Sequence, residues 1–112
     1  MTEQIIPEKF LEKESLSKEG YKRINKITND DRGSFERYAA KMDDIEADFS
    51  KNYKDVKKTK RKDFYMLEFK KKFLGPVGFK IVLSRSLRAV TVKVMSDHIG
   101  LIELLIDTLR SE

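Results

Sequence analysis

The chain has 112 residues, of which 38% are charged and 39% hydrophobic, and its net charge is +5 at pH 7. This length fits a single domain, residues 1–112, and the hydrophobic fraction excludes a fully disordered chain. The absence of cysteine excludes disulfides and thiolate metal sites, and no apolar run approaches the roughly 20 residues of a membrane span. The first residues also lack the basic start and apolar stretch of a signal peptide. We therefore expect a soluble cytoplasmic protein with no membrane partner.

Short helices are predicted for residues 1–33. Pro7 suits the first turn of a helix over 7–14, because a backbone N–H at that position would be unpaired anyway. Ser15 or Ser17 is the candidate cap of a second helix. The apolar residues that these helices would bury are Phe10 and Leu11 in the first, and Tyr21, Ile24 and Ile27 in the second.

A long helix is predicted to begin at Ser34, whose side chain suits a helix N-terminus. The apolar positions that follow are separated by three, four or seven residues, which is the spacing of a heptad seam. They are Phe35, Tyr38, Met42, Ile45, Phe49 and Val56. The pattern predicts a helix from 34 to about residue 60, which either packs on its own domain or pairs in a coiled-coil homodimer.

Residues 63–74 fit two interpretations. The alternation of Tyr65, Leu67 and Phe69 is typical of a strand, whereas lysines followed by Gly75 and Pro76 are typical of a helix end. We favour the helix, so that the predicted helical segment covers 34–74 and the sequence leaves its end open.

After residue 77 the apolar period changes to two. Residues 79–84 and 89–95 alternate as strands, and the short connection between them predicts an antiparallel hairpin. A last helix is expected to begin at Ser96 or Asp97, and its apolar arc is wide enough for deep burial or for an additional interface. The predicted fold class is therefore α+β: N-terminal helices including one long heptad-patterned helix, then the hairpin and a C-terminal amphipathic helix.

Catalytic and metal-binding motifs are not found in the sequence. His98 is the only histidine, and there is neither a Gly-x-Ser-x-Gly elbow nor a phosphate-binding loop. The cluster Asp43, Asp44, Glu46 and Asp48 is interpreted as a solvated helix face, which a basic partner would also fit. We expect no enzyme, no cofactor and no metal.

Positive charge is concentrated in residues 54–73, which contain nine Lys or Arg and three Asp or Glu. Such a local basic segment is typical of a protein with a polyanionic partner, although a solvated lysine-rich face has the same composition. Basic residues interleaved with aromatic residues are typical of single-strand binding. The candidate partner- or nucleic-acid-binding residues are Lys57, Lys58, Lys60, Arg61, Lys62, Tyr65, Arg85 and Arg88. For the other aromatic residues, core packing is the favoured interpretation.

Residues 34–112 resemble a small family of type II anti-CRISPR proteins encoded by phages of Gram-positive bacteria. The resemblance is carried by the Tyr-Ala-x-x-Met-Asp pattern of residues 38–43, by Leu83 and Ser84 at the end of a strand, and by the Val-rich strand and apolar helix that follow. Compared with that family, the hairpin loop is shorter and a basic N-terminal arm is absent. The resemblance implies an inhibitor without catalysis of its own, in which Lys57 to Lys62 would take the role of the arm.

Three functions are therefore expected, in this order. The first is a phage-type inhibitor that binds an RNA-guided nuclease, its guide complex or another host nucleoprotein in the host cytoplasm. The second is a small basic protein that binds single-stranded DNA, single-stranded RNA or structured RNA. The third is a coiled-coil adaptor that acts as a homodimer.

Overall fold

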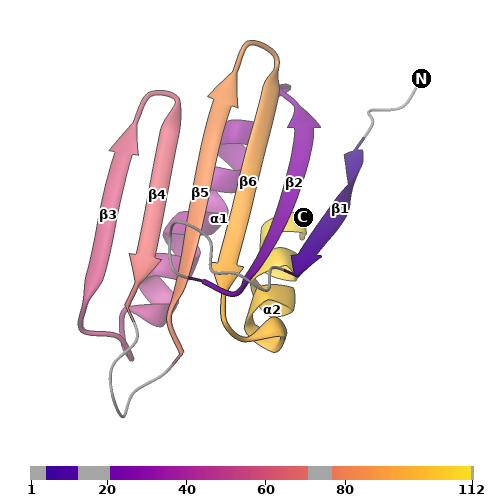
Figure 1. The fold of residues 1–112 in the computed structure, drawn as a ribbon. Coiled ribbons are helices and arrows are strands. Elements are labelled where there is room, and N and C mark those ends of the chain that lie inside the picture. The colour runs from indigo at the N-terminus through magenta and orange to yellow at the C-terminus, as the bar shows by residue number, and fades with distance from the viewer. Residues whose placement is uncertain (1–4, 13–20, 71–76, 112) are drawn as a thin grey trace.

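The computed structural model describes residues 5–12, 21–70 and 77–111, and within 5–12 it describes the backbone. Six strands and two helices are found in these residues (Figure 1). In chain order they are β1 (Ile5–Glu12), β2 (Arg23–Asp30), α1 (Ser34–Phe49), β3 (Val56–Arg61), β4 (Phe64–Phe69), β5 (Phe79–Ser86), β6 (Ala89–Ser96) and α2 (Ile99–Arg110).

The strands form one antiparallel sheet in the order β1-β2-β6-β5-β4-β3. Strands β3 to β6 follow one another as a meander, and β2 then pairs with β6, so that β1 and β3 are the edges. Both helices lie on the same face of the sheet (Figure 1). We call that face the helix face and the opposite one the outer face.

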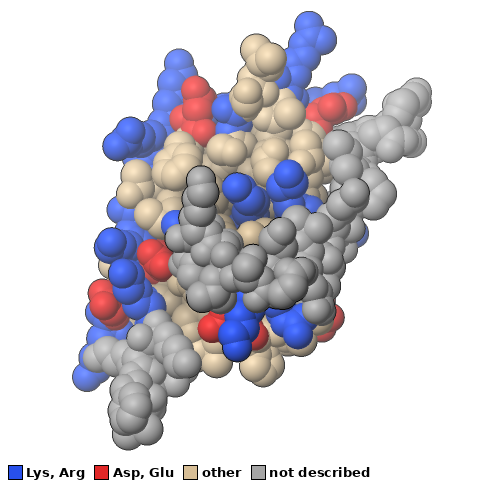
Figure 2. Space-filling model, in the orientation of Figure 1, with Lys and Arg blue, Asp and Glu red and all other residues tan. Residues whose placement is uncertain are grey.

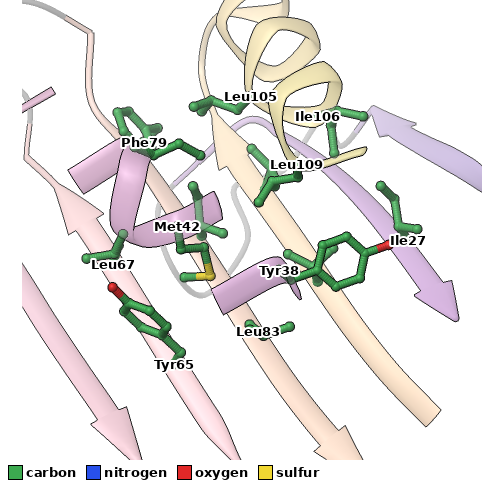
Figure 3. Close-up of a cluster of buried hydrophobic side chains, with 14 of the residues drawn as sticks. Ile27, Tyr38, Met42, Tyr65, Leu67, Phe79, Leu83, Leu105, Ile106 and Leu109 are labelled. Carbon is green, nitrogen blue, oxygen red and sulfur yellow. The ribbon is translucent and has the colours of Figure 1, made fainter. Parts of the chain in front are cut away.

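The hydrophobic core fills the space between the helices and the sheet. Every second residue is buried over residues 65–69 of β4, 79–83 of β5 and 90–94 of β6, because alternate side chains point to opposite faces. In Figure 3, Met42 of α1 and Leu109 of α2 point towards the strands that carry Leu67 and Leu83. These residues are all fully buried, so the period of two in the sequence identifies the core side of the sheet.

An aromatic cluster closes the core at the end of α1. Phe69 of β4 and Phe79 of β5 are paired across the strands, and their rings stack with centroids 4.7 Å apart. Phe49 and Tyr53 meet these two rings edge-on, at 5.1 to 6.2 Å. The chain therefore turns back on the sheet after α1 instead of continuing outwards.

The predicted long heptad helix is wrong, because α1 ends at Phe49 and Val56 begins strand β3. A turn follows α1, with the N–H of Ser50 bonded to the Glu46 carbonyl and that of Asn52 to the Phe49 carbonyl. The first positions of the apparent seam are buried in the core of the same chain, so they are not available to a coiled-coil partner. The steps of three and four lie within α1, whereas the step of seven joins Phe49 of the helix to Val56 of a strand that packs on the same cluster.

The helix α1 begins at Ser34 as predicted, but the Ser34 side chain does not act as its cap. Ser34 is buried, and its hydroxyl donates to the Asp30 carbonyl at 2.9 Å instead of accepting from the helix. The residue before it, Gly33, has a φ of 81°, which a residue without a side chain adopts readily.

The N-terminal helices are likewise not found, since 5–12 and 23–30 are strands. In β2, Asn25, Ile27 and Asn29 face the helices. Because two of these three buried residues are polar, the sequence of β2 does not show the apolar alternation that is typical of a strand. Pro7 lies in edge strand β1, where the register shifts between Ile6 and Lys9. An edge or an irregular pair is where a sheet tolerates a residue without an N–H. The proposed caps Ser15 and Ser17 lie outside the described residues.

Residues 64–69 form strand β4, so the helix favoured for 63–74 is wrong as well. Its proposed end at Gly75 and Pro76, and Lys71 and Lys72 of the last turn, lie outside the described residues. The hairpin of β5 and β6 is found where the sequence predicts it, and a C-terminal helix follows it. The predicted start of that helix at Ser96 or Asp97 is wrong, because Ser96 is the last residue of β6 and α2 begins at Ile99. Neither described helix is both long enough and apolar enough to cross a membrane.

Candidate nucleic-acid interface

Strand β3 divides the basic segment between the two faces of the sheet. Lys58 pairs with Leu67 and Lys60 with Tyr65, both of which are buried under the helices. Lys57 and Arg61 alternate with them and therefore lie on the outer face. The five cations of the predicted cluster thus do not form one surface, and Lys62 lies apart in the turn after β3.

The lysines on the helix face are neutralised by acidic residues of α1. The ammonium group of Lys58 lies 2.8 Å from a Glu46 oxygen, and that of Lys60 lies 3.4 Å from Asp43. The hydrogen bond to Glu46 raises the pKa of Lys58. Burial alone would raise the pKa of Asp43, but the Tyr65 hydroxyl and the charge of Lys60 outweigh it and lower that pKa. Half of the acidic cluster therefore pairs with β3 instead of forming a solvated face.

Tyr65, predicted as an exposed binding residue, is fully buried in the core. Its hydroxyl donates to Asp43 at 2.5 Å, and Lys60 lies 4.7 Å from its ring centroid. Burial, together with this hydrogen bond and the charge of Asp43, raises the pKa of the phenol. Tyr65 therefore joins β4 to α1 and does not contact a partner.

Replacing Tyr65→Phe is expected to lower the free energy of unfolding by about 1 kcal/mol, because one hydrogen bond is lost while the ring remains. Nucleic-acid affinity is expected not to change.

Above about pH 10 the unfolded chain releases a phenolic proton that native Tyr65 retains, so the free energy of unfolding falls as the pH rises, and it falls less in the variant. Urea denaturation at neutral and alkaline pH measures both effects. If Tyr65→Phe binds nucleic acid more weakly but is as stable as the wild type, Tyr65 contacts the partner and its assignment to the core is wrong.

Arg85 links the two hairpins to the start of α1. Its guanidinium group donates to Asp63 at 3.1 Å, to Asp31 at 3.3 Å and to the Lys62 carbonyl at 3.2 Å. It also lies 4.3 Å from the ring centroid of Phe35. These contacts occupy the donors of Arg85, so the prediction that it contacts a phosphate backbone is not supported by its position. Arg88 is exposed in the turn between β5 and β6.

The outer face carries a second set of cations, which differ from those of the helix face in their lack of ion pairs within the described residues. Their positions follow from the strand registers, in which they alternate with core residues. They are Lys26 of β2, Lys57 and Arg61 of β3, Lys80 of β5 and Lys93 of β6. Within the described part of the chain none of the five forms an ion pair. Two carboxylates on these strands face the same way. Asp30, the last residue of β2, lies 4.0 Å from Arg32, and Glu68 of β4 accepts a hydrogen bond from the Tyr21 hydroxyl at 2.9 Å.

Two of these lysines are direct neighbours. Lys26 and Lys93 are opposite each other in the antiparallel pair of β2 and β6. Like charges in such a pair repel, which destabilises the sheet unless an anion lies between them. In the view of Figure 2, which looks onto the outer face, Lys and Arg line the β3 edge and the ends of the hairpins.

Apolar side chains lie between the charged rows of the outer face. Phe64 and Met66 of β4 and Val82 of β5 are half-buried there, although no described helix covers them. Lys57 and Arg61 are four residues apart on β3, a distance of about 13 Å along the strand. The outer face thus combines spaced positive charges with flat apolar contacts.

Sequence reasoning missed Lys26, Lys80, Lys93 and Phe64. A signal existed for two of them, because Lys80 and Lys93 occupy the polar positions of strands whose alternation is clear. Lys26 and Phe64 gave no such signal, since their segments were interpreted as helical. His98 is exposed, and within 5–12, 21–70 and 77–111 no group of acidic or histidine residues has the geometry of a metal site.

Comparisons with protein-family models, curated proteins and solved structures found no significant match to the chain.

Proposed function

We propose that this protein binds single-stranded nucleic acid on the outer face of its sheet. The observation that carries the proposal is the separation of the cations into two sets. Lys58, Lys60 and Arg85 on the helix face pair with carboxylates, whereas the five outer-face cations have no ionic partner in the described chain. Unpaired cations spaced over one surface fit the phosphates of a polyanion.

The shape of the site favours a single strand over a duplex. The major groove of B-DNA admits a helix or a two-stranded ribbon, whereas this sheet is six strands wide. An extended single strand has unpaired bases, and these stack on flat side chains between basic residues. Phe64 is the aromatic residue on the outer face of β4 and supplies such a contact. The helix layer on the other side exposes Asp44 and Asp48, which repel phosphate.

The test is a fluorescence-anisotropy titration with labelled oligothymidine of about 15 nucleotides, a length within the range that single-strand-binding domains cover. The expected result is a dissociation constant in the micromolar range or below, with an affinity that falls steeply as salt rises. A duplex of the same length serves as the control and is expected to bind more weakly. If oligothymidine does not bind at low salt, or the duplex binds better, the proposal is wrong.

A second candidate is the inhibitor of an RNA-guided nuclease or its guide complex. It is favoured by the order α1, β5, β6 and α2, which follows the elements that carry the resemblance of residues 34–112. The β3–β4 hairpin between α1 and β5 departs from that resemblance. This function predicts no affinity for free oligothymidine but co-purification with a nuclease–guide complex. The coiled-coil adaptor is not proposed, because its seam lies in the core.

A further inference from the structure

The turn between β5 and β6 presents a leucine to solvent. Ser86 and Ala89 are paired, so that Leu87 and Arg88 alone form the turn. The side chain of Leu87 is 96% exposed, more than any other large hydrophobic side chain in the described residues. Its φ is 55°, in the left-handed region, whereas that of Arg88 is not positive. Glycine is the common residue at a first turn position with positive φ.

Folding by itself therefore does not favour leucine at this position. Leu87 gains no burial in the native chain, and its branched side chain is unfavourable at a positive φ. Sparsely populated backbone conformations of this kind are concentrated at functional sites. An exposed apolar side chain held in such a conformation suggests a ligand contact.

The turn is also firmly anchored. The N–H of Asp31 donates to the Arg88 carbonyl at 2.7 Å, and the N–H of Arg85 donates to the Asp63 carbonyl at 3.0 Å. The side chain of Arg85 adds its bond to the Lys62 carbonyl in the neighbouring turn. Figure 1 shows the β5–β6 turn projecting beyond that of β3 and β4. The backbone that carries Leu87 is therefore held in a defined position at the end of the β5–β6 hairpin.

The surroundings of the turn are polar and carry charges of both signs. A hollow of about 310 Å³ beside it is lined by Asp30, Asp31, Arg32 and Arg88. Asp31 pairs with Arg85 at 3.3 Å and Asp30 with Arg32 at 4.0 Å. Arg88 forms no ion pair within the described residues. The positions next to Leu87 thus combine an unpaired cation with a polar hollow.

We propose that Leu87 packs against an unpaired base at one end of the bound single strand, while Arg88 contacts an adjacent phosphate. This inference rests on the proposed function, and it assigns Leu87 as the residue that contacts the end of the bound strand. An aliphatic side chain fits the plane of an unstacked base, as apolar wedges do between base steps. The anchored turn keeps the side chain in place before binding, so that little conformational freedom is lost on contact.

The discriminating variant is Leu87→Gly, which removes the side chain and relieves the positive φ. We expect its melting temperature to equal or exceed that of the wild type, while its affinity for oligothymidine falls about tenfold. Leu87→Met, which keeps an apolar side chain, is the matched control and is expected to retain most of the affinity. Leu87→Asn, which tolerates a positive φ but is polar, is expected to lose affinity as the glycine variant does.

A fluorescent base analogue placed at either end of the oligonucleotide locates the contact. A change of emission on binding is expected at one end with the wild type, and its loss with Leu87→Gly. If the glycine variant binds as tightly as the wild type, Leu87 is not a base contact, although the outer face remains the proposed site. If the wild-type protein binds no oligonucleotide, the proposed function fails first, so the two failures are distinguishable.

Discussion

The double variant Lys57→Glu, Arg61→Glu is expected to bind single-stranded DNA about 30-fold more weakly than the wild type, or weaker still. Two cations without ionic partners in the described chain are lost, and two negative charges replace them on the outer face of β3. Because each lost phosphate contact removes about one released counterion, the slope of log affinity against log salt should fall by about two. Anisotropy titrations at several salt concentrations measure both quantities.

The matched control changes the net charge by the same amount elsewhere. Arg37 and Lys51 are exposed on α1 and just after it, on the helix side of the molecule. Arg37→Glu combined with Lys51→Glu is expected to change the affinity only slightly, since long-range charge effects are screened over about 10 Å at moderate salt. Equal losses in both double variants would show that net charge, not the outer face, governs binding, and the assignment of the site would be wrong.

Phe79→Ala is expected to lower the free energy of unfolding by about 3–5 kcal/mol. Its side chain is fully buried, stacks on Phe69 at 4.7 Å and meets Phe49 edge-on at 5.1 Å. Since domains of this size are stable by only about 5–15 kcal/mol, the variant would lose a large share of its stability. Urea denaturation followed by circular dichroism measures the change.

Phe79→Leu serves as the comparison, because it retains most of the apolar volume and is expected to cause a clearly smaller loss than alanine. The result also tests the architecture, since Phe79 is where strand β5, strand β4 and the end of α1 meet. A loss below about 1 kcal/mol for the alanine variant would contradict the aromatic cluster described here.

The sequence predicted best where one apolar period runs uninterrupted. Strand β5 buries every second residue from Phe79 to Leu83, β6 does so from Val90 to Val94, and α2 has a continuous apolar arc, so local pattern and burial agree there. The prediction failed at strand β2 because Asn25 and Asn29 occupy buried positions, where the side-chain amide nitrogen of Asn29 donates a hydrogen bond to the hydroxyl of Tyr38. A polar residue that is paired in the core cannot be distinguished by composition from one in solvent.

The prediction also failed at strand β3, for a related reason. Its helix-face positions Lys58 and Lys60 are held by Glu46 and Asp43, so the strand shows no apolar alternation. Ion pairs between an edge strand and a helix thus replaced the hydrophobic contacts on which the prediction depended. The same pairs removed two of the predicted binding residues from the site.

The amino-acid sequence is sufficient to predict a small charged chain, the C-terminal hairpin and helix, and the concentration of positive charge in residues 54–73. These properties depend on composition and on periods of a few residues. Which cations are available to a partner follows from the folded arrangement instead. That division depends on strand register and on acidic residues distant in sequence, such as Asp31 for Arg85, and it brings Lys26 and Lys93 onto the same face as Lys57 and Arg61.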